Sequence, residues 1–181
     1  MALTAGGMTL VGAAPDLVLA NTQSVASFIK GETAAGTNLS TKTADYVRDI
    51  QKTNTDQLVK VFDPKQSSDK LNVFGKEFAQ VLGDGGSNKY GTTKVFATEK
   101  LSDRDIIDYA QSLTGEEPFK EVTTPLGTVY FSKKDSVTIS LRDYSAIEEK
   151  TNARWTIEIL GNEDLQALQG KVKKKVEIKF R

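Results

Sequence analysis

The stretch "GTVYFSKKDSVTISLRDYS", Gly127 to Ser145, decides the fold class, because apolar and polar side chains alternate along most of it. Successive side chains of a β-strand point to opposite faces, so a period of two is typical of a half-buried strand. The short polar segment "KKDS" separates two such alternating runs. We therefore expect two antiparallel strands with one face in the core and the other in solvent.

The same period of two recurs elsewhere in the chain. "WTIEI" at residues 155–159 and "VEIKF" at residues 176–180 alternate in the same way, and "TKVFAT" at residues 93–98 is a candidate further strand. Loops are expected over residues 143–152 and 160–174, where the alternation stops. The pattern predicts an antiparallel sheet built largely from the second half of the chain.

The residues before the sheet carry apolar side chains at helical spacing. The clearest case is "LSDRDIIDYAQSLTG" at residues 101–115, in which Ser102 can cap the helix, Asp105 can complete a capping box and Gly115 can end it. Further helices are expected over residues 15–30, 40–61 and 74–82. Helices followed by strands predict an α+β fold, with helices packed on one face of a curved antiparallel sheet.

A boundary is expected after Pro64, where the polar run "KQSSD" follows. It predicts a helical N-terminal region, residues 1–65, and a C-terminal domain, residues 66–181. The most apolar segment, "MTLVGAAPDLVLA", contains Pro15 and Asp16 and is shorter than the roughly 20 residues that span a bilayer.

The composition excludes several kinds of chemistry. The chain has no cysteine and no histidine, so thiolate metal sites, cysteine nucleophiles and histidine bases are excluded, and we expect neither a metal nor a cofactor. The formal net charge is zero, yet the C-terminal segment "KVKKKVEIKFR" contains five lysines and one arginine against one glutamate. Such a run is most often a solvated strand face, and less often a surface that contacts phosphates.

If the apolar residues of each strand face the core, the opposite face is polar and cationic. We expect Val129, Phe131 and Trp155 to point inward. The opposite face then carries Thr128, Tyr130, Thr138, Ser140, Arg142, Arg154, Thr156, Glu158, Lys175, Glu177, Lys179 and Arg181. It is either a solvated sheet face or a cleft for a phosphodiester, in which Arg142 and Arg154 clamp the phosphate.

The order of motifs resembles a known family. "LSDRDIIDYAQSLTG", then "GTVYFSKKDSVTISLRDYS", "ARWTIEI" and "VEIKFR" are similar to the C-terminal toxin domains of contact-dependent growth inhibition systems, and more narrowly to ribonucleases of the barnase/EndoU/colicin/RelE fold. The resemblance covers residues 101–181. It implies metal-independent cleavage of RNA, with tRNA as the expected substrate, by attack of a 2'-hydroxyl on the adjacent phosphate.

The resemblance also implies partners and a location. A cognate immunity protein would neutralise the toxin, and a translation elongation factor is a possible activator. The domain would be released from a secreted cell-surface protein of the producer and act in the cytoplasm of the target cell. Residues 1–65 would then assist a transient passage through the target membrane.

Site roles follow from the chemistry that such a reaction needs. Arg142 and Arg154 would stabilise charge on the phosphate, Glu158 or Lys179 would take the proton, and Thr156 and Ser145 would orient the scissile bond. A lysine with a depressed pKa suits the role of base, because cationic neighbours lower a lysine's pKa. The expected RNA-binding residues are Lys133, Lys134, Ser140, Tyr130, Lys173, Lys175 and Arg181.

Two alternatives remain open at this stage. A non-catalytic binding module, of the immunity or adaptor type, would also present a sheet face, although the cationic C-terminus is opposite in sign to proteins that mimic nucleic acid. A deoxyribonuclease toxin would need a metal site of histidine or clustered carboxylates, and no such spacing is found in the sequence.

Overall fold

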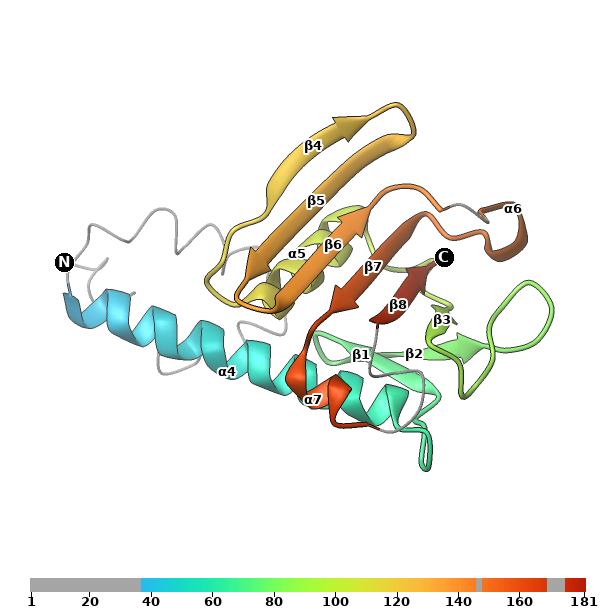
Figure 1. The fold of residues 1–181 in the computed structure, drawn as a ribbon, viewed down its shortest axis with the longest axis horizontal. Coiled ribbons are helices and arrows are strands. Elements are labelled where there is room, and N and C mark those ends of the chain that lie inside the picture. Colours follow the sequence, from blue (N-terminus) through green and yellow to red (C-terminus); the bar gives the residue numbers. More distant parts are fainter. Residues whose placement is uncertain (1–36, 146–147, 169–174) are drawn as a thin grey trace.

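The described residues form an α+β fold built on one eight-stranded sheet (Figure 1). The computed structural model describes residues 37–145, 148–168 and 175–181. Its elements are α4 (Thr37–Phe62), β1 (Lys70–Val73), β2 (Lys76–Val81), β3 (Thr93–Phe96), α5 (Asp103–Thr114), β4 (Lys120–Thr124), β5 (Gly127–Lys134), β6 (Val137–Arg142), α6 (Glu148–Thr151), β7 (Trp155–Leu160), α7 (Glu163–Gln166) and β8 (Lys175–Phe180). The strand order is β1-β2-β3-β8-β7-β6-β5-β4.

The sheet is mostly antiparallel, as expected, with one parallel pair. The predicted strands β5, β6, β7 and β8 are neighbours and run antiparallel to one another. The candidate strand at residues 93–98 is present as β3, but it pairs with β8 in parallel. A parallel pair needs a long connection, and here α5 and strands β4 to β7 lie between the two strands in the chain.

The predicted capping box begins α5. The Asp105 amide donates to Ser102 Oγ at 3.1 Å, and the Ser102 amide donates to Asp105 Oδ2 at 3.1 Å. Gly115 ends the helix with a φ of +67°, a conformation that glycine adopts at little cost. The helix buries Ile106 and Leu113 toward the sheet, so the predicted helix and its buried face are confirmed.

The long helix α4 matches the predicted helix at residues 40–61 but begins earlier, at Thr37. Ser40 therefore lies within the helix and is not its cap. Leu58, Val61 and Phe62 at its C-terminal end belong to the same hydrophobic cluster as the strands of the sheet. The predicted division at residue 65 falls between α4 and β1, and the separate character of residues 1–65 stays a prediction.

The prediction of a helix over residues 74–82 is wrong, because these residues form part of the β1–β2 hairpin. Phe74 and Gly75 have φ values of +51° and +83°, and Asn72 Oδ1 accepts a hydrogen bond from the Gly75 amide at 3.0 Å. This turn reverses the chain and fixes the hairpin. The predicted loops at residues 143–152 and 160–174 contain the short helices α6 and α7, and β4 was not expected.

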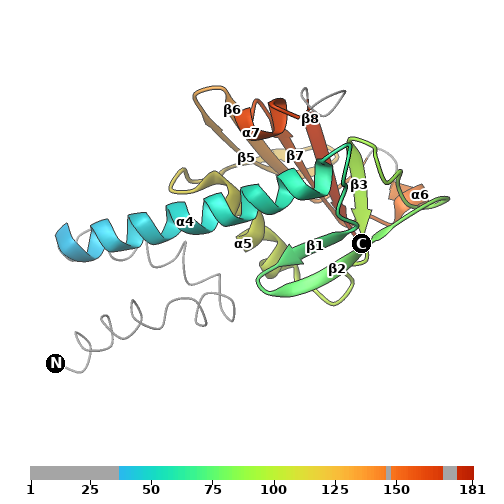
Figure 2. The same ribbon diagram turned by 90° about the horizontal axis from the view of Figure 1, so that it is seen from below.

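Helix α5 packs on one face of the sheet, as the fold class predicts. Figure 1 shows α5 behind β5 and β6 with α4 running below the lower ends of the strands, and Figure 2 shows α4 nearest the viewer, where it contacts α5 and β1. Between the helices and the sheet lie Tyr109, Leu141, Ile157, Ile178 and Phe180, all fully buried. The opposite face of β4 to β8, here called the open face, is where the sequence places its polar side chains. The helix expected over residues 15–30 lies outside the described residues.

Candidate functional site

The strand register aligns three predicted site residues in one row on the open face. Arg142 on β6 is directly opposite Thr156 on β7, and Thr156 is directly opposite Lys179 on β8. Paired residues of neighbouring antiparallel strands share a face, with Cβ atoms about 5 Å apart. Ser140, Glu158 and Glu177 form the adjacent row in the same three strands.

Lys179 is an unusual lysine, because its side chain is nearly inaccessible to solvent. The residue is 2% exposed, and its Nζ donates a hydrogen bond to Ser145 Oγ. Burial lowers the pKa of Lys179 below that of an ordinary lysine, and Arg142 lowers it further, whereas Glu177 opposes the shift. A larger fraction of the amine is therefore neutral, and able to accept a proton, than in an exposed lysine.

Thr156, in the centre of the row, is 0% exposed. Its Oγ1 is buried and has no hydrogen-bond partner among the described residues. Leaving a buried hydroxyl unpaired costs about 1–3 kcal/mol, so such a group calls for an explanation beyond folding. The unpaired hydroxyl lies between two cationic side chains, which is where an anionic ligand oxygen would be attracted.

Arg142 is held by two glutamates from the adjacent row. Its Nη1 lies 3.8 Å from Glu158 Oε2, and its Nη2 lies 3.7 Å from Glu177 Oε2. Lys175 Nζ bridges the same two carboxylates at 3.0 and 3.3 Å. Hydrogen bonding to Glu158 raises the pKa of Lys175. The Glu158 carboxylate is therefore engaged by two cations, Arg142 and Lys175.

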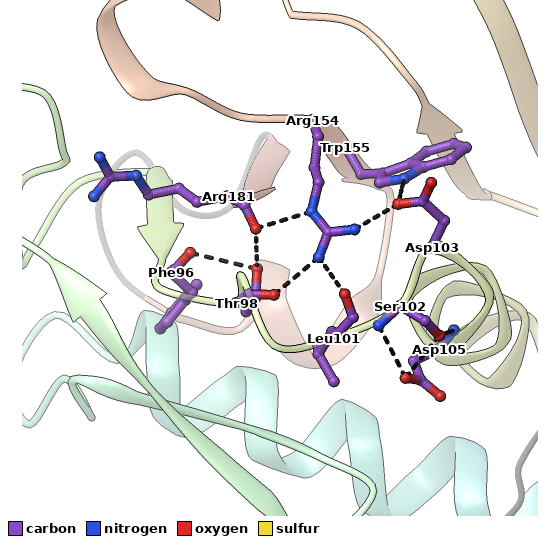
Figure 3. Close-up of polar contacts among 9 residues, drawn as sticks. All are labelled: Phe96, Thr98, Leu101, Ser102, Asp103, Asp105, Arg154, Trp155 and Arg181. Atoms are coloured by element: carbon purple, nitrogen blue, oxygen red, sulfur yellow. Dashed lines mark hydrogen bonds and ion pairs between the residues drawn. The ribbon is translucent and has the colours of Figure 1, made fainter.

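Arg154 does not join Arg142, contrary to the predicted pair of clamps. Its guanidinium binds the Asp103 carboxylate and the main-chain oxygens of Leu101, Thr98 and Arg181 (Figure 3). Trp155 packs against the core, as expected, and its Nε1 donates to the same Asp103 oxygen at 2.8 Å. These contacts fasten the start of β7 to the start of α5.

The predicted facing of β5 is also wrong. Ser132 is buried, and Tyr130 packs against the core, with its ring 6.3 Å from those of Phe119 and Trp155. Val129 and Phe131 consequently lie on the open face, opposite Arg142 and Ser140. Residues 129–131 are all apolar, so the alternating pattern did not decide which side faced inward. Burial raises the pKa of Tyr130, which makes its hydroxyl a poorer acid.

The remaining predicted RNA-binding residues are dispersed. Lys133 lies on the open face opposite Thr138, whereas Lys134 is exposed on the other side of β5 at its end. Arg181 follows β8, and its Nε is 3.9 Å from Glu99. Lys173 lies outside the described residues. The structure thus brings together Arg142, Ser145, Thr156, Glu158 and Lys179, to which it adds Glu177 and the half-buried Phe131.

Comparison with known proteins adds no relative. No protein-family model matches the chain, and neither the curated proteins nor the solved structures compared with it gave a match. Within residues 37–145, 148–168 and 175–181, no three acidic side chains are grouped as a metal site would require. No described helix is long and apolar enough to cross a bilayer.

Proposed function

We propose that the chain is a metal-independent ribonuclease whose active site is the row of Arg142, Thr156 and Lys179 with the adjoining Ser145. The observation that supports this most is the unpaired, buried hydroxyl of Thr156 between the two cationic residues. A phosphodiester oxygen would provide the missing hydrogen-bond partner and would match the local charge.

In the proposed reaction, neutral Lys179 removes the proton from an RNA 2'-hydroxyl. The 2' oxygen attacks the adjacent phosphorus, the bond to the 5' oxygen breaks, and water supplies the proton to that leaving oxygen. The products are a 2',3'-cyclic phosphate and a free 5'-hydroxyl. Arg142 and the Thr156 hydroxyl stabilise the charge that builds on the phosphate oxygens.

The acidic residues have a supporting part in this scheme. Glu158 and Glu177 hold the Arg142 guanidinium beside Thr156, through contacts of 3.8 and 3.7 Å. Because Thr156 and Lys179 are nearly inaccessible, contact with RNA in this scheme requires a local opening of the structure around them. Ser145, which accepts the hydrogen bond from Lys179, acts as a positioning residue.

We further propose, on the strength of the sequence resemblance, that the protein is an antibacterial toxin domain of the barnase/EndoU/colicin/RelE type that cleaves tRNA. An α+β fold with helices behind a mostly antiparallel sheet is compatible with this. The cognate immunity protein, the activating elongation factor and entry into target cells belong to the same proposal.

The test is incubation of the purified protein with total tRNA in EDTA, with and without an elongation factor, followed by mapping of the cut ends. We expect fragments with 2',3'-cyclic phosphates. Lys179→Met, which keeps the length of the side chain, should slow cleavage about 10²- to 10⁴-fold, the usual contribution of a general base.

Lys76→Met, at an exposed lysine on β2, is the matched control and should cleave at the rate of the unmodified protein. Equal cleavage by the Lys179 variant would exclude this site. Failure of the unmodified protein to cut any RNA under all these conditions, while still binding it, would favour a non-catalytic module instead.

A further inference from the structure

The open face continues beyond the charged row onto β5 and β4, where its chemistry changes. Val122 on β4 pairs with Val129 on β5, and Lys120 pairs with Phe131. Val122 is 44% exposed, and Phe131 is half-buried and lies outside the hydrophobic core cluster. This part of the face, the β4–β5 surface, is defined by Lys120, Val122, Val129, Phe131 and Lys133.

The β4–β5 surface combines an aromatic ring with two cations. Lys120 and Lys133 make no salt bridge to any residue that the structure describes. They flank Phe131, since Lys120 is its cross-strand partner and Lys133 lies two residues further along the same face. Proteins that bind single-stranded nucleic acid combine these two features, cationic side chains for the backbone and aromatic rings on which bases stack.

The position of Phe131 relative to the row also fits a nucleotide. Phe131 pairs with Ser140, two residues before Arg142 on β6, so Phe131 and Arg142 are diagonal neighbours. Such neighbours have Cα atoms about 7–8 Å apart and are within reach of long side chains. A base stacked on Phe131 would therefore place its own phosphate near Arg142 and Thr156.

We propose that Phe131 is the base-stacking residue of this site, and that the substrate is an unpaired nucleotide of RNA, in a single strand or a loop. A base within a helix cannot stack on a protein ring, because its faces are covered by neighbouring base pairs. This inference rests on the proposed ribonuclease function for its biological meaning, but binding and cleavage can be measured separately.

The experiment uses a single-stranded RNA oligonucleotide with 2'-O-methyl groups, which binds but cannot undergo 2'-hydroxyl attack. Phe131→Ala should weaken its binding roughly 5- to 150-fold, the range expected for loss of one stacked base. Phe131→Leu, which keeps an apolar side chain, should lose the same affinity, and Phe131→Trp should retain it. Leu126→Ala, at a 73% exposed apolar residue in the β4–β5 turn, is the control and should bind normally.

Phe131→Trp also reports stacking directly. Its fluorescence should be quenched by the single strand and not by the same sequence annealed to its complement, while the native Trp155 is buried and gives a constant background. Lys120→Met and Lys133→Met should each reduce the logarithmic salt dependence of binding by roughly 0.7. Normal binding by Phe131→Ala, or equal quenching by the duplex, would overturn the inference.

The two proposals fail in distinguishable ways. If the unmodified protein binds the oligonucleotide through Phe131 but never cuts 2'-hydroxyl RNA, the ribonuclease proposal is wrong and the stacking residue stands. If RNA is cut at the same rate and KM by Phe131→Ala as by the unmodified protein, the ribonuclease proposal stands and the stacking residue is wrong.

Discussion

Thr156 and Lys179 lie directly opposite each other in neighbouring strands, and both are buried although they point away from the main hydrophobic core. Among the described residues, Lys179 has no acidic partner at salt-bridge distance, and Thr156 Oγ1 has no hydrogen-bond partner. A buried hydroxyl and a buried amine in this position lower stability and are explained by function more readily than by folding.

Replacing Thr156 with valine should therefore separate stability from activity. The substitution keeps the shape and removes the unpaired hydroxyl, so we expect the free energy of unfolding to rise by about 1 kcal/mol. Cleavage of RNA should fall roughly 10- to 100-fold, because a donor to the phosphate is lost. Urea unfolding and single-turnover cleavage measure the two effects, and Thr138→Val, four residues before Arg142 on β6, is the control. A variant that is less stable and fully active would contradict the role of Thr156.

Arg154→Met should reduce stability and leave the chemistry unchanged. The guanidinium binds one carboxylate and three main-chain oxygens, so removing it breaks four contacts at the junction of α5, β3 and β7. We expect a loss of roughly 2–4 kcal/mol in the free energy of unfolding. The rate of RNA cleavage per folded molecule, measured at low temperature, should stay the same. Normal stability with lost cleavage would restore Arg154 to the catalytic role predicted from the sequence.

Asp108 should make the protein less stable as the pH rises from 4 to 6. Burial raises its pKa from 3.8 to about 6, even though Arg104 Nε lies 3.2 Å away and opposes the shift. The folded state holds its proton up to about pH 6 and the unfolded state releases it near pH 4, so the stabilisation present at low pH is lost over this window. Asp108→Asn should abolish this slope and stabilise the protein at pH 7 by up to about 3 kcal/mol. Denaturant titrations at pH 4 and pH 7 would show whether it does.

Lys94 should have the opposite effect at alkaline pH. Its Nζ donates to the Val61 carbonyl at the end of α4 and to Ser67 Oγ, and burial lowers its pKa to about 8. Between pH 8 and 10.5 the Lys94 amine is protonated in the unfolded state and neutral in the folded state. The free energy of unfolding therefore rises with pH over that window. Lys94→Met should flatten the rise, which amounts to about 3 kcal/mol at most. Lys76→Met should leave it intact, and a similar loss of slope in both variants would contradict the assignment to Lys94.

Features that depend on nearby residues were predictable from the sequence. The sequence predicts helix α5 with its cap and its end, because Ser102 and Asp105 act together over three positions and Gly115 directly follows the last helical residue. The alternation in β6, β7 and β8 likewise placed Arg142, Thr156 and Lys179 on one face. The pattern of neighbouring residues is thus sufficient to predict that Arg142, Thr156 and Lys179 share one face of the sheet.

Features that depend on distant residues were not predictable. The Asp103 that binds Arg154 is 51 positions away in the chain, and nothing beside Arg154 indicates that pairing. In β5, the three apolar residues 129–131 allow either facing, and packing against Phe119 and Trp155 decides it. At residues 74–82, Phe74, Phe78 and Val81 happen to have helical spacing, whereas the turn at Gly75 determines the structure.

The central place of β8 has a consequence for the order in which the protein is completed. In the described sheet, β8 is the strand that joins β1–β3 to β4–β7, and it is the last of these strands to be synthesised. Until residues 175–180 arrive, β3 and β7 each present an unpaired edge, and the partners of Thr156 and Arg142 on β8 are missing. A nascent chain on the ribosome would therefore hold two incomplete half-sheets, and the proposed site could not assemble before synthesis had passed β8.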